Sequence, residues 1–114
     1  MNQQILLIDD ERDFCQLLKE QMSRHHFSFE CAYTLGEGIL KMEHTHPDIL
    51  ILDNHLPDGR GWTEAGKLQK AYPNMRIILI SALDQPAFEE TGLGLQFTRI
   101  CKPVSFYDLE PYLA

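Results

Sequence analysis

The side chains best suited to chemistry follow apolar runs of this sequence. Asp9 and Asp10 follow the run ILLI, Asp53 follows ILIL, Ser81 follows IILI, and Lys102 follows FTRIC. If these runs are parallel strands, three carboxylates meet at one sheet edge, where low dielectric strengthens their mutual repulsion. A hard divalent cation offsets such repulsion, and Mg²⁺ typically takes one or two carboxylates together with a phosphate oxygen.

Asp53 is the expected nucleophile of this group. A carboxylate with a metal beside it and the Lys102 ammonium opposite is activated for phosphoryl transfer, with an aspartyl phosphate as product. The Ser81 hydroxyl and Lys102 suit two phosphoryl oxygens. Alone, each signal has a plainer explanation, since an Asp after a strand is usually a turn residue or a helix cap. Their order and spacing together favour the chemical interpretation.

The segments that would position these residues alternate between strand and helix patterns. Apolar runs predict strands at 5–8, 48–52 and 76–81, and the mixed apolar and polar segments 27–33 and 97–101 are predicted to be the second and fifth strands. Apolar residues at helical spacing predict helices between them, with Thr34 capping the second, and a short helix within 86–91. Ser105 and Asp108 predict a capping box for a last helix, which Pro111 should shorten or kink. This alternation predicts an α/β fold with a parallel sheet between two helical layers.

The bulk composition is that of an ordinary globular chain. Its 114 residues suit one domain spanning 1–114, and its net charge of -7 argues against direct contact with nucleic acid or an anionic membrane. No apolar run is long enough to span a membrane, and we expect a cytoplasmic protein. Three cysteines without CxxC spacing are expected to stay reduced, and His44-x-His46 is expected to be a solvated helix end.

The four clusters together resemble the receiver domain of two-component response regulators. The resemblance rests on Asp9-Asp10-Glu11, Asp53 followed by Leu56-Pro57-Asp58-Gly59 and Gly61, Ser81-Ala82 and Lys102-Pro103, and it covers essentially the whole chain. It implies a flavodoxin-like, doubly wound sheet of five strands in the order 2-1-3-4-5. It also implies a signalling domain, not an enzyme, in which Asp53 accepts a phosphoryl group from a sensor histidine kinase or phosphotransfer protein.

The same resemblance implies a role for each site residue. Asp10 and Asp53 would ligate Mg²⁺ directly, Asp9 would assist through water, and His55 would contribute its backbone carbonyl. Ser81 and Lys102 would hold phosphoryl oxygens, and the bond between Lys102 and Pro103 would be cis, as is usual in the family.

The expected switch departs from the family pattern. Arg99 stands three residues before Lys102, where the family usually has a Tyr or Phe that swings inward when the hydroxyl residue moves. Phe97, on the same strand face, is the candidate substitute. The stretch between Ala82 and Lys102 also departs from the pattern, with GLGL in place of a clear helix. We therefore expect an intact phosphorylation site and an atypical switch formed by Ser81, Arg99 and Phe97.

Two other functions stay open at this point. One is a pseudo-receiver, an interaction module that keeps the fold and signals without phosphorylation. The other is an aspartate-nucleophile phosphohydrolase, because Asp9-x-Glu11 is similar to the Asp-x-Asp of those enzymes. Further expected partners are an effector domain in the same chain, if 1–114 is the N-terminal part of a longer protein, and a second copy in a phosphorylation-dependent homodimer.

Overall fold

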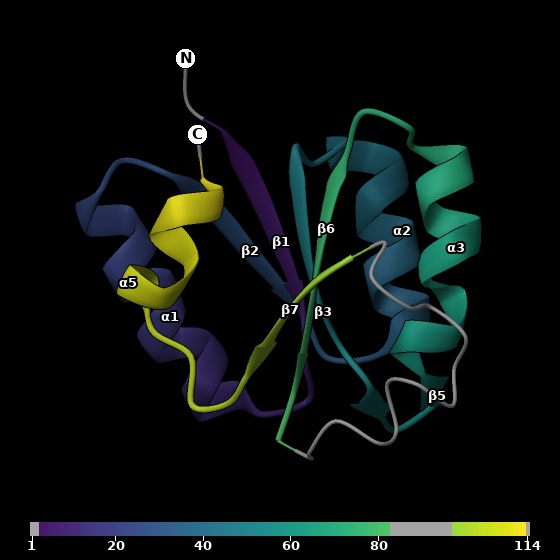
Figure 1. Ribbon diagram of the computed structural model, residues 1–114, viewed down its shortest axis with the longest axis horizontal. Coiled ribbons are helices and arrows are strands. Elements are labelled where there is room, and N and C mark those ends of the chain that lie inside the picture. The colour runs from purple at the N-terminus through teal and green to yellow at the C-terminus, as the bar shows by residue number, and fades with distance from the viewer. Residues whose placement is uncertain (1–2, 83–96, 114) are drawn as a thin grey trace.

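A computed structural model describes residues 3–82 and 97–113. Its centre is a five-stranded parallel sheet in the order β2-β1-β3-β6-β7 (Figure 1). The strands are β1 (Gln4–Ile8), β2 (Ser28–Ala32), β3 (Ile49–Asp53), β6 (Arg76–Ser81) and β7 (Thr98–Cys101). Counted among the strands of this sheet alone, the order is 2-1-3-4-5, which confirms the predicted fold.

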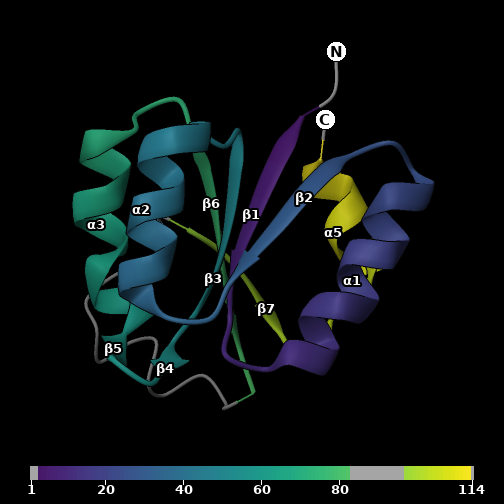
Figure 2. The same cartoon turned by 180° about the vertical axis from the view of Figure 1, so that it is seen from behind.

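Helices cover both faces of the sheet. α1 (Arg12–Arg24) and α5 (Phe106–Leu109) lie on one face, while α2 (Leu35–Thr45) and α3 (Gly61–Ala71) lie on the other (Figures 1 and 2). Each central strand therefore buries alternate side chains in two separate cores. In β1, Ile5 and Leu7 pack on the α1 side, whereas Leu6 and Ile8 pack on the α2 side. This two-sided burial explains why the strands are continuous apolar runs.

The predicted helix ends are confirmed. The Thr34 hydroxyl accepts the Glu37 amide at 3.0 Å before α2, and the Asp108 carboxylate accepts the Ser105 amide at 2.8 Å in the capping box of α5. α5 ends at Leu109, and Pro111 follows in a 3-10 turn, η1 (Glu110–Tyr112). The helix expected within 86–91 lies outside the described residues. Within the part that the structure describes, no helix is long and apolar enough to cross a bilayer.

Two features differ from the sequence-based expectation. A two-stranded antiparallel sheet, β4 (His55–Leu56) with β5 (Gly59–Arg60), follows Asp53, where the sequence analysis predicted no strand. The cysteines are not all reduced, because Cys15 of α1 and Cys31 of β2 form a disulfide. Sequence spacing could not predict this bond, since it depends on how α1 packs against the edge strand β2 and brings the two Cα atoms within 6.2 Å.

Candidate functional site

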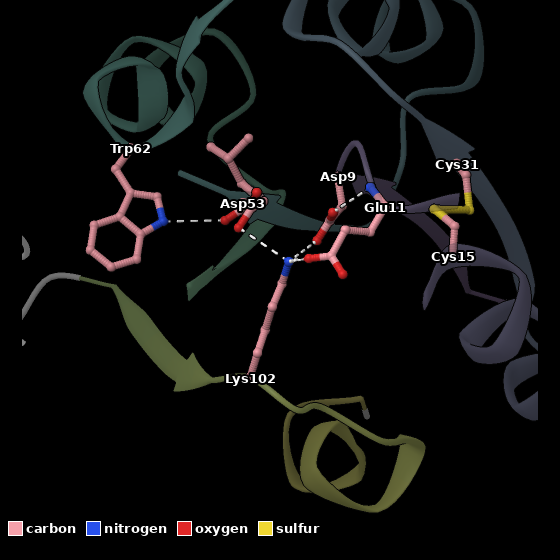
Figure 3. Close-up of polar contacts among 8 residues, drawn as sticks. Asp9, Glu11, Cys15, Cys31, Asp53, Trp62 and Lys102 are labelled. Atoms are coloured by element: carbon pink, nitrogen blue, oxygen red, sulfur yellow. Dashed lines mark hydrogen bonds and ion pairs between the residues drawn. A yellow bond between two sulfur atoms is a disulfide. The ribbon is translucent and has the colours of Figure 1, made fainter. Parts of the chain in front are cut away.

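The carboxyl ends of the parallel strands bring the predicted residues to one edge of the sheet. Asp9 directly follows β1, Asp53 ends β3 and Ser81 ends β6, and these side groups are buried, with 0%, 3% and 5% of their residue surface exposed. Lys102 directly follows β7 and points toward Asp9 and Asp53 (Figure 3). Buried charged groups of this kind need partners, and Lys102 serves both carboxylates.

The Lys102 ammonium is the central cation of the site. Its Nζ lies 2.6 Å from Asp9 Oδ2, 2.8 Å from Glu11 Oε1 and 3.5 Å from Asp53 Oδ1 (Figure 3). The Lys102 backbone amide donates to the Ser81 carbonyl at 3.0 Å, which fixes the start of the side chain beside β6. Lys102 Nζ is thus closer to the carboxylates of Asp9 and Glu11, which follow β1, than to the carboxylate of Asp53. Glu11, 60% exposed at its side chain, is a partner that the sequence analysis did not assign.

Burial and charge perturb the protonation of the two inner carboxyl groups. Burial, and then repulsion from Asp9, raise the pKa of Asp53 to about 7, although Lys102 opposes the rise. Burial likewise raises the pKa of Asp9 against the effect of Lys102. Burial opposes the charge of Lys102, but its hydrogen bonds with Asp9 and Glu11 raise its pKa overall. One ammonium therefore does not neutralise this site, which favours a further cation.

The carboxylates fit a hard divalent cation. Asp9, Asp10 and Asp53 each offer an oxygen, and these oxygens lie within 4.8 Å of one another. Asp10 is exposed while the other two are buried, so the group has an open side toward solvent. Oxygen ligands with an open side suit Mg²⁺, which retains part of its water shell. His55 lies in β4 two residues after Asp53 with an exposed side chain, as expected if only its backbone has a role.

Close backbone packing anchors the segment after Asp53 to α3. A Cβ atom on Gly61 would lie 2.1 Å from the Asp53 carbonyl oxygen, so only glycine fits there. The buried Asn54 accepts the Gly61 amide at its carbonyl and the Trp62 amide at Oδ1, at 3.0 and 3.2 Å. The Trp62 indole donates to the Leu52 carbonyl at 3.3 Å (Figure 3). Asn54 is a positioning residue that the sequence did not reveal, because its role depends on this packing.

Asp58 joins the same loop to the other helix of that face. Its two carboxylate oxygens accept the Leu35 and Gly36 amides, at 2.8 and 3.0 Å, at the N-terminus of α2. These hydrogen bonds, led by the one from Gly36, lower the pKa of Asp58. A carboxylate is well placed there because helix N-termini carry partial positive charge. The loop that follows Asp53 is therefore fixed at both α2 and α3.

The two expected switch residues are Arg99 in β7 and Phe97 directly before that strand. Arg99 pairs in register with Leu79, whose side chain packs in the core beneath α2 and α3, and Arg99 is half-buried. Phe97 is 9% exposed and belongs to that same core. The GLGL segment expected to replace a helix lies outside the described residues.

The family of the chain follows from its sequence and its fold together. A family model described as the response regulator receiver domain matches residues 5–113. The chain belongs to this family. Receiver domains are signalling domains that bind Mg²⁺ at an acidic pocket and interact with histidine kinases or phosphotransfer proteins, and the Asp9, Asp10 and Asp53 cluster lies at the corresponding edge of this receiver domain.

Solved structures agree with this assignment. The receiver domain resembles a CheY-like response regulator receiver domain protein from Methanospirillum hungatei JF-1, at 26% identity and a TM-score of 0.88 over 98% of this chain and 90% of the other. It is equally similar to a two-component response regulator from Clostridium difficile, at 26% identity and a TM-score of 0.87 over 97% and 92%. A response regulator from Burkholderia pseudomallei, 18% identical, shares the fold at a TM-score of 0.87 over 99% and 67%.

Proposed function

We propose that this receiver domain accepts a phosphoryl group on Asp53 from a sensor histidine kinase or phosphotransfer protein. The observation that carries the proposal is the convergence of Lys102 on Asp9 and Asp53 at the carboxyl edge of the sheet. The response regulator from Burkholderia pseudomallei, which shares this fold, has a phosphorylated aspartic acid and a calcium ion in its structure.

The proposed reaction needs Asp53 as an anion. A carboxylate oxygen of Asp53 attacks phosphorus, the bond from phosphorus to the donor nitrogen breaks, and the donor imidazole keeps the electron pair of that bond. Lys102, 3.5 Å from Asp53, moves from its contact with Glu11 to meet the charge that grows on the phosphoryl oxygens. The Ser81 hydroxyl donates to another of these oxygens.

Magnesium is the proposed cofactor, held by Asp9, Asp10, Asp53 and the backbone carbonyl of His55. When bound it neutralises charge on the carboxylates and on the transferred group. The protein supplies a rigid mount, because every residue of β3 is buried and the loop after Asp53 is fixed at α3 by Asn54.

Phosphorylation in vitro tests the proposal directly. Incubation with acetyl phosphate and Mg²⁺ should add one phosphoryl mass to the wild type, and Asp53→Asn should abolish the addition. Glu43→Gln, which removes an exposed carboxylate from α2, is the matched control and should label like the wild type. A folded wild-type protein that never labels, with acetyl phosphate or with a phosphorylated histidine donor, would favour a pseudo-receiver that signals by binding alone.

We further propose that the conformational switch is atypical. Phe97 is already buried in the core beneath α2 and α3, which leaves it little inward movement to make. Arg99 occupies the usual aromatic position on the same strand face, and a guanidinium does not substitute for an aromatic ring in an apolar core. Structures of the free and beryllofluoride-bound protein test this, because an inward swing of Phe97, the residue directly before β7, would contradict it.

The proposal extends to the surroundings of the domain. Residues 1–114 form one receiver domain, consistent with the family match over 5–113. The expected partners are the phosphoryl donor, an effector domain in a longer chain, and a second copy after phosphorylation. The domain works in the cytoplasm, where kinases have ATP. Size-exclusion chromatography of the phosphorylated and the unphosphorylated protein tests the homodimer, because only the phosphorylated protein should elute as a dimer.

A further inference from the structure

The disulfide joins two elements that also border the candidate site. Cys15 lies in the first turns of α1 and its amide donates to the Glu11 carbonyl at 3.1 Å. Cys31 lies in β2 beside Ala32, whose carbonyl accepts the Asp9 amide at 3.0 Å. Figure 3 shows the disulfide between α1 and β2, in the same view as Glu11 and Asp9. The disulfide thus connects α1, which follows Glu11, with β2, which is hydrogen-bonded to Asp9.

The two cysteines differ in their access to solvent. Cys15 is fully buried, whereas Cys31 is partly buried and lines a surface cavity of about 190 Å³. The other residues that line this cavity are Gln16, Lys19, Glu30, Tyr33 and Lys41. The cavity is large enough for a molecule of the size of hydrogen peroxide beside Cys31, and two ammonium groups and one carboxylate, those of Lys19, Lys41 and Glu30, line it. Cys15, with 0% of its surface exposed, has no direct contact with solvent.

We propose that Cys15 and Cys31 form a hydroperoxide-oxidisable dithiol, with Cys31 as the attacked residue and Cys15 as the resolving residue. The Cys31 thiolate attacks one peroxide oxygen, the O–O bond breaks, and a sulfenic acid and hydroxide form. The Cys15 thiol then attacks the Cys31 sulfur, and its proton leaves with the hydroxyl group as water. The two thiols lose two electrons in total, and the peroxide gains them. The disulfide of the structure is the product.

The placement of the pair allows the bond to form and break without rearrangement of the backbone. The Cα atoms are 6.2 Å apart, within the range that a disulfide spans without backbone movement. The proposed cytoplasmic location keeps thiols reduced at rest, and disulfides that form in such compartments are mostly transient or redox-sensing. The chemistry of the pair does not require phosphorylation of Asp53, so the two proposals can fail independently.

The experiment uses the full chain, reduced with dithiothreitol and freed of it, then treated with hydrogen peroxide. Cys101→Ser serves as the working background, because Cys101 lies outside the disulfide and is exposed. Intact mass should fall by two hydrogen atoms, peptide mapping should give a crosslink between Cys15 and Cys31 within one chain, and dithiothreitol should restore both thiols.

A second variant tests the order of the two steps. In Cys15→Ala on the Cys101→Ser background, peroxide should leave a sulfenic acid on Cys31 that dimedone traps. The proposal is overturned if the parent protein keeps both thiols open to alkylation after peroxide, or if it forms crosslinks only between chains. It is also overturned if dimedone labels Cys15 in Cys31→Ala more than Cys31 in Cys15→Ala. If a variant does not fold, the crosslink map of the parent protein still decides.

Discussion

Asp53→Asn should stabilise the metal-free protein, and more so as pH rises. The pKa of Asp53 is raised from its ordinary 3.8 to about 7, mainly by burial and then by Asp9. At about 1.4 kcal/mol for each pKa unit, the ionised carboxylate lowers the free energy of unfolding by about 4 kcal/mol. The side group is only 3% exposed, so solvent screens little of this effect. The carboxamide of the variant carries no charge and avoids the cost.

The sign of the pH dependence follows from proton binding in the two states. Below pH 3.8 Asp53 is protonated both folded and unfolded, and it has no effect. Between that pH and about 7 the unfolded chain loses the proton while the folded protein keeps it, so the free energy of unfolding falls as pH rises. Above about pH 7 both states are ionised and the loss is complete.

Urea denaturation in the presence of a chelator measures the effect. The free energy of unfolding of the wild type minus that of Asp53→Asn should fall by about 4 kcal/mol between about pH 4 and about pH 8. Glu43→Gln, an exposed carboxylate on α2, controls for loss of one charge. At the higher pH, Mg²⁺ at about 100 times its dissociation constant should raise the free energy of unfolding by about 2.7 kcal/mol in the wild type alone. A difference that stays constant within about 1 kcal/mol over the whole range would refute the reasoning.

Three further predictions address the surroundings of this carboxylate. Glu11→Gln removes a close partner of Lys102, which should then turn toward Asp53 and speed labelling by acetyl phosphate about two- to fivefold, as the loss of a partly exposed ion pair allows. Unchanged labelling kinetics would contradict this role. Gly61→Ala places a methyl group against the Asp53 carbonyl and should lower the free energy of unfolding, measured by urea denaturation, by about 2–3 kcal/mol. Gly66→Ala, at a site with nothing within 4 Å, should not lower it. Asp58→Ala removes the acceptor at the start of α2 and should lower the protection of amides in the first turn of that helix against hydrogen exchange, measured by NMR relative to their intrinsic exchange rates. In the wild type, whose Asp58 pKa is lowered, the same loss of protection should appear as pH falls through that pKa.

Elements and site residues could be predicted from the sequence wherever local residue patterns and strand direction determine where they lie. Strand and helix patterns in alternation predicted all five strands of the sheet, and the rule for carboxyl ends of parallel strands then placed Asp9, Asp53, Ser81 and Lys102 at one edge. Boundaries shifted slightly where polar residues continue a strand. Asp53, for example, was predicted to follow its strand but is its last residue.

Features that depend on tertiary packing could not be predicted in this way. Glu11 meets Lys102 across 91 positions of sequence, and the choice between it and Asp53 as the nearer partner depends on fractions of an ångström. Asn54 and Asp58 are ordinary turn residues in sequence, and their roles emerge only because helix N-termini lie within hydrogen-bonding distance. The bond between Cys15 and Cys31 likewise requires the register between a helix and an edge strand.

The charge of the sheet edge has a consequence for the order in which ligands arrive. Fully ionised, four carboxylates (Asp9, Asp10, Glu11 and Asp53) stand against the single ammonium of Lys102 there, a local charge of 1 − 4 = −3. A phosphoryl donor is itself an anion, so it approaches the bare site against a repulsive field that only dissolved salt weakens. Binding of the cation before the phosphoryl donor is therefore the kinetically favoured order. Concentrated salt should raise the association rate of the donor most when no divalent cation is present.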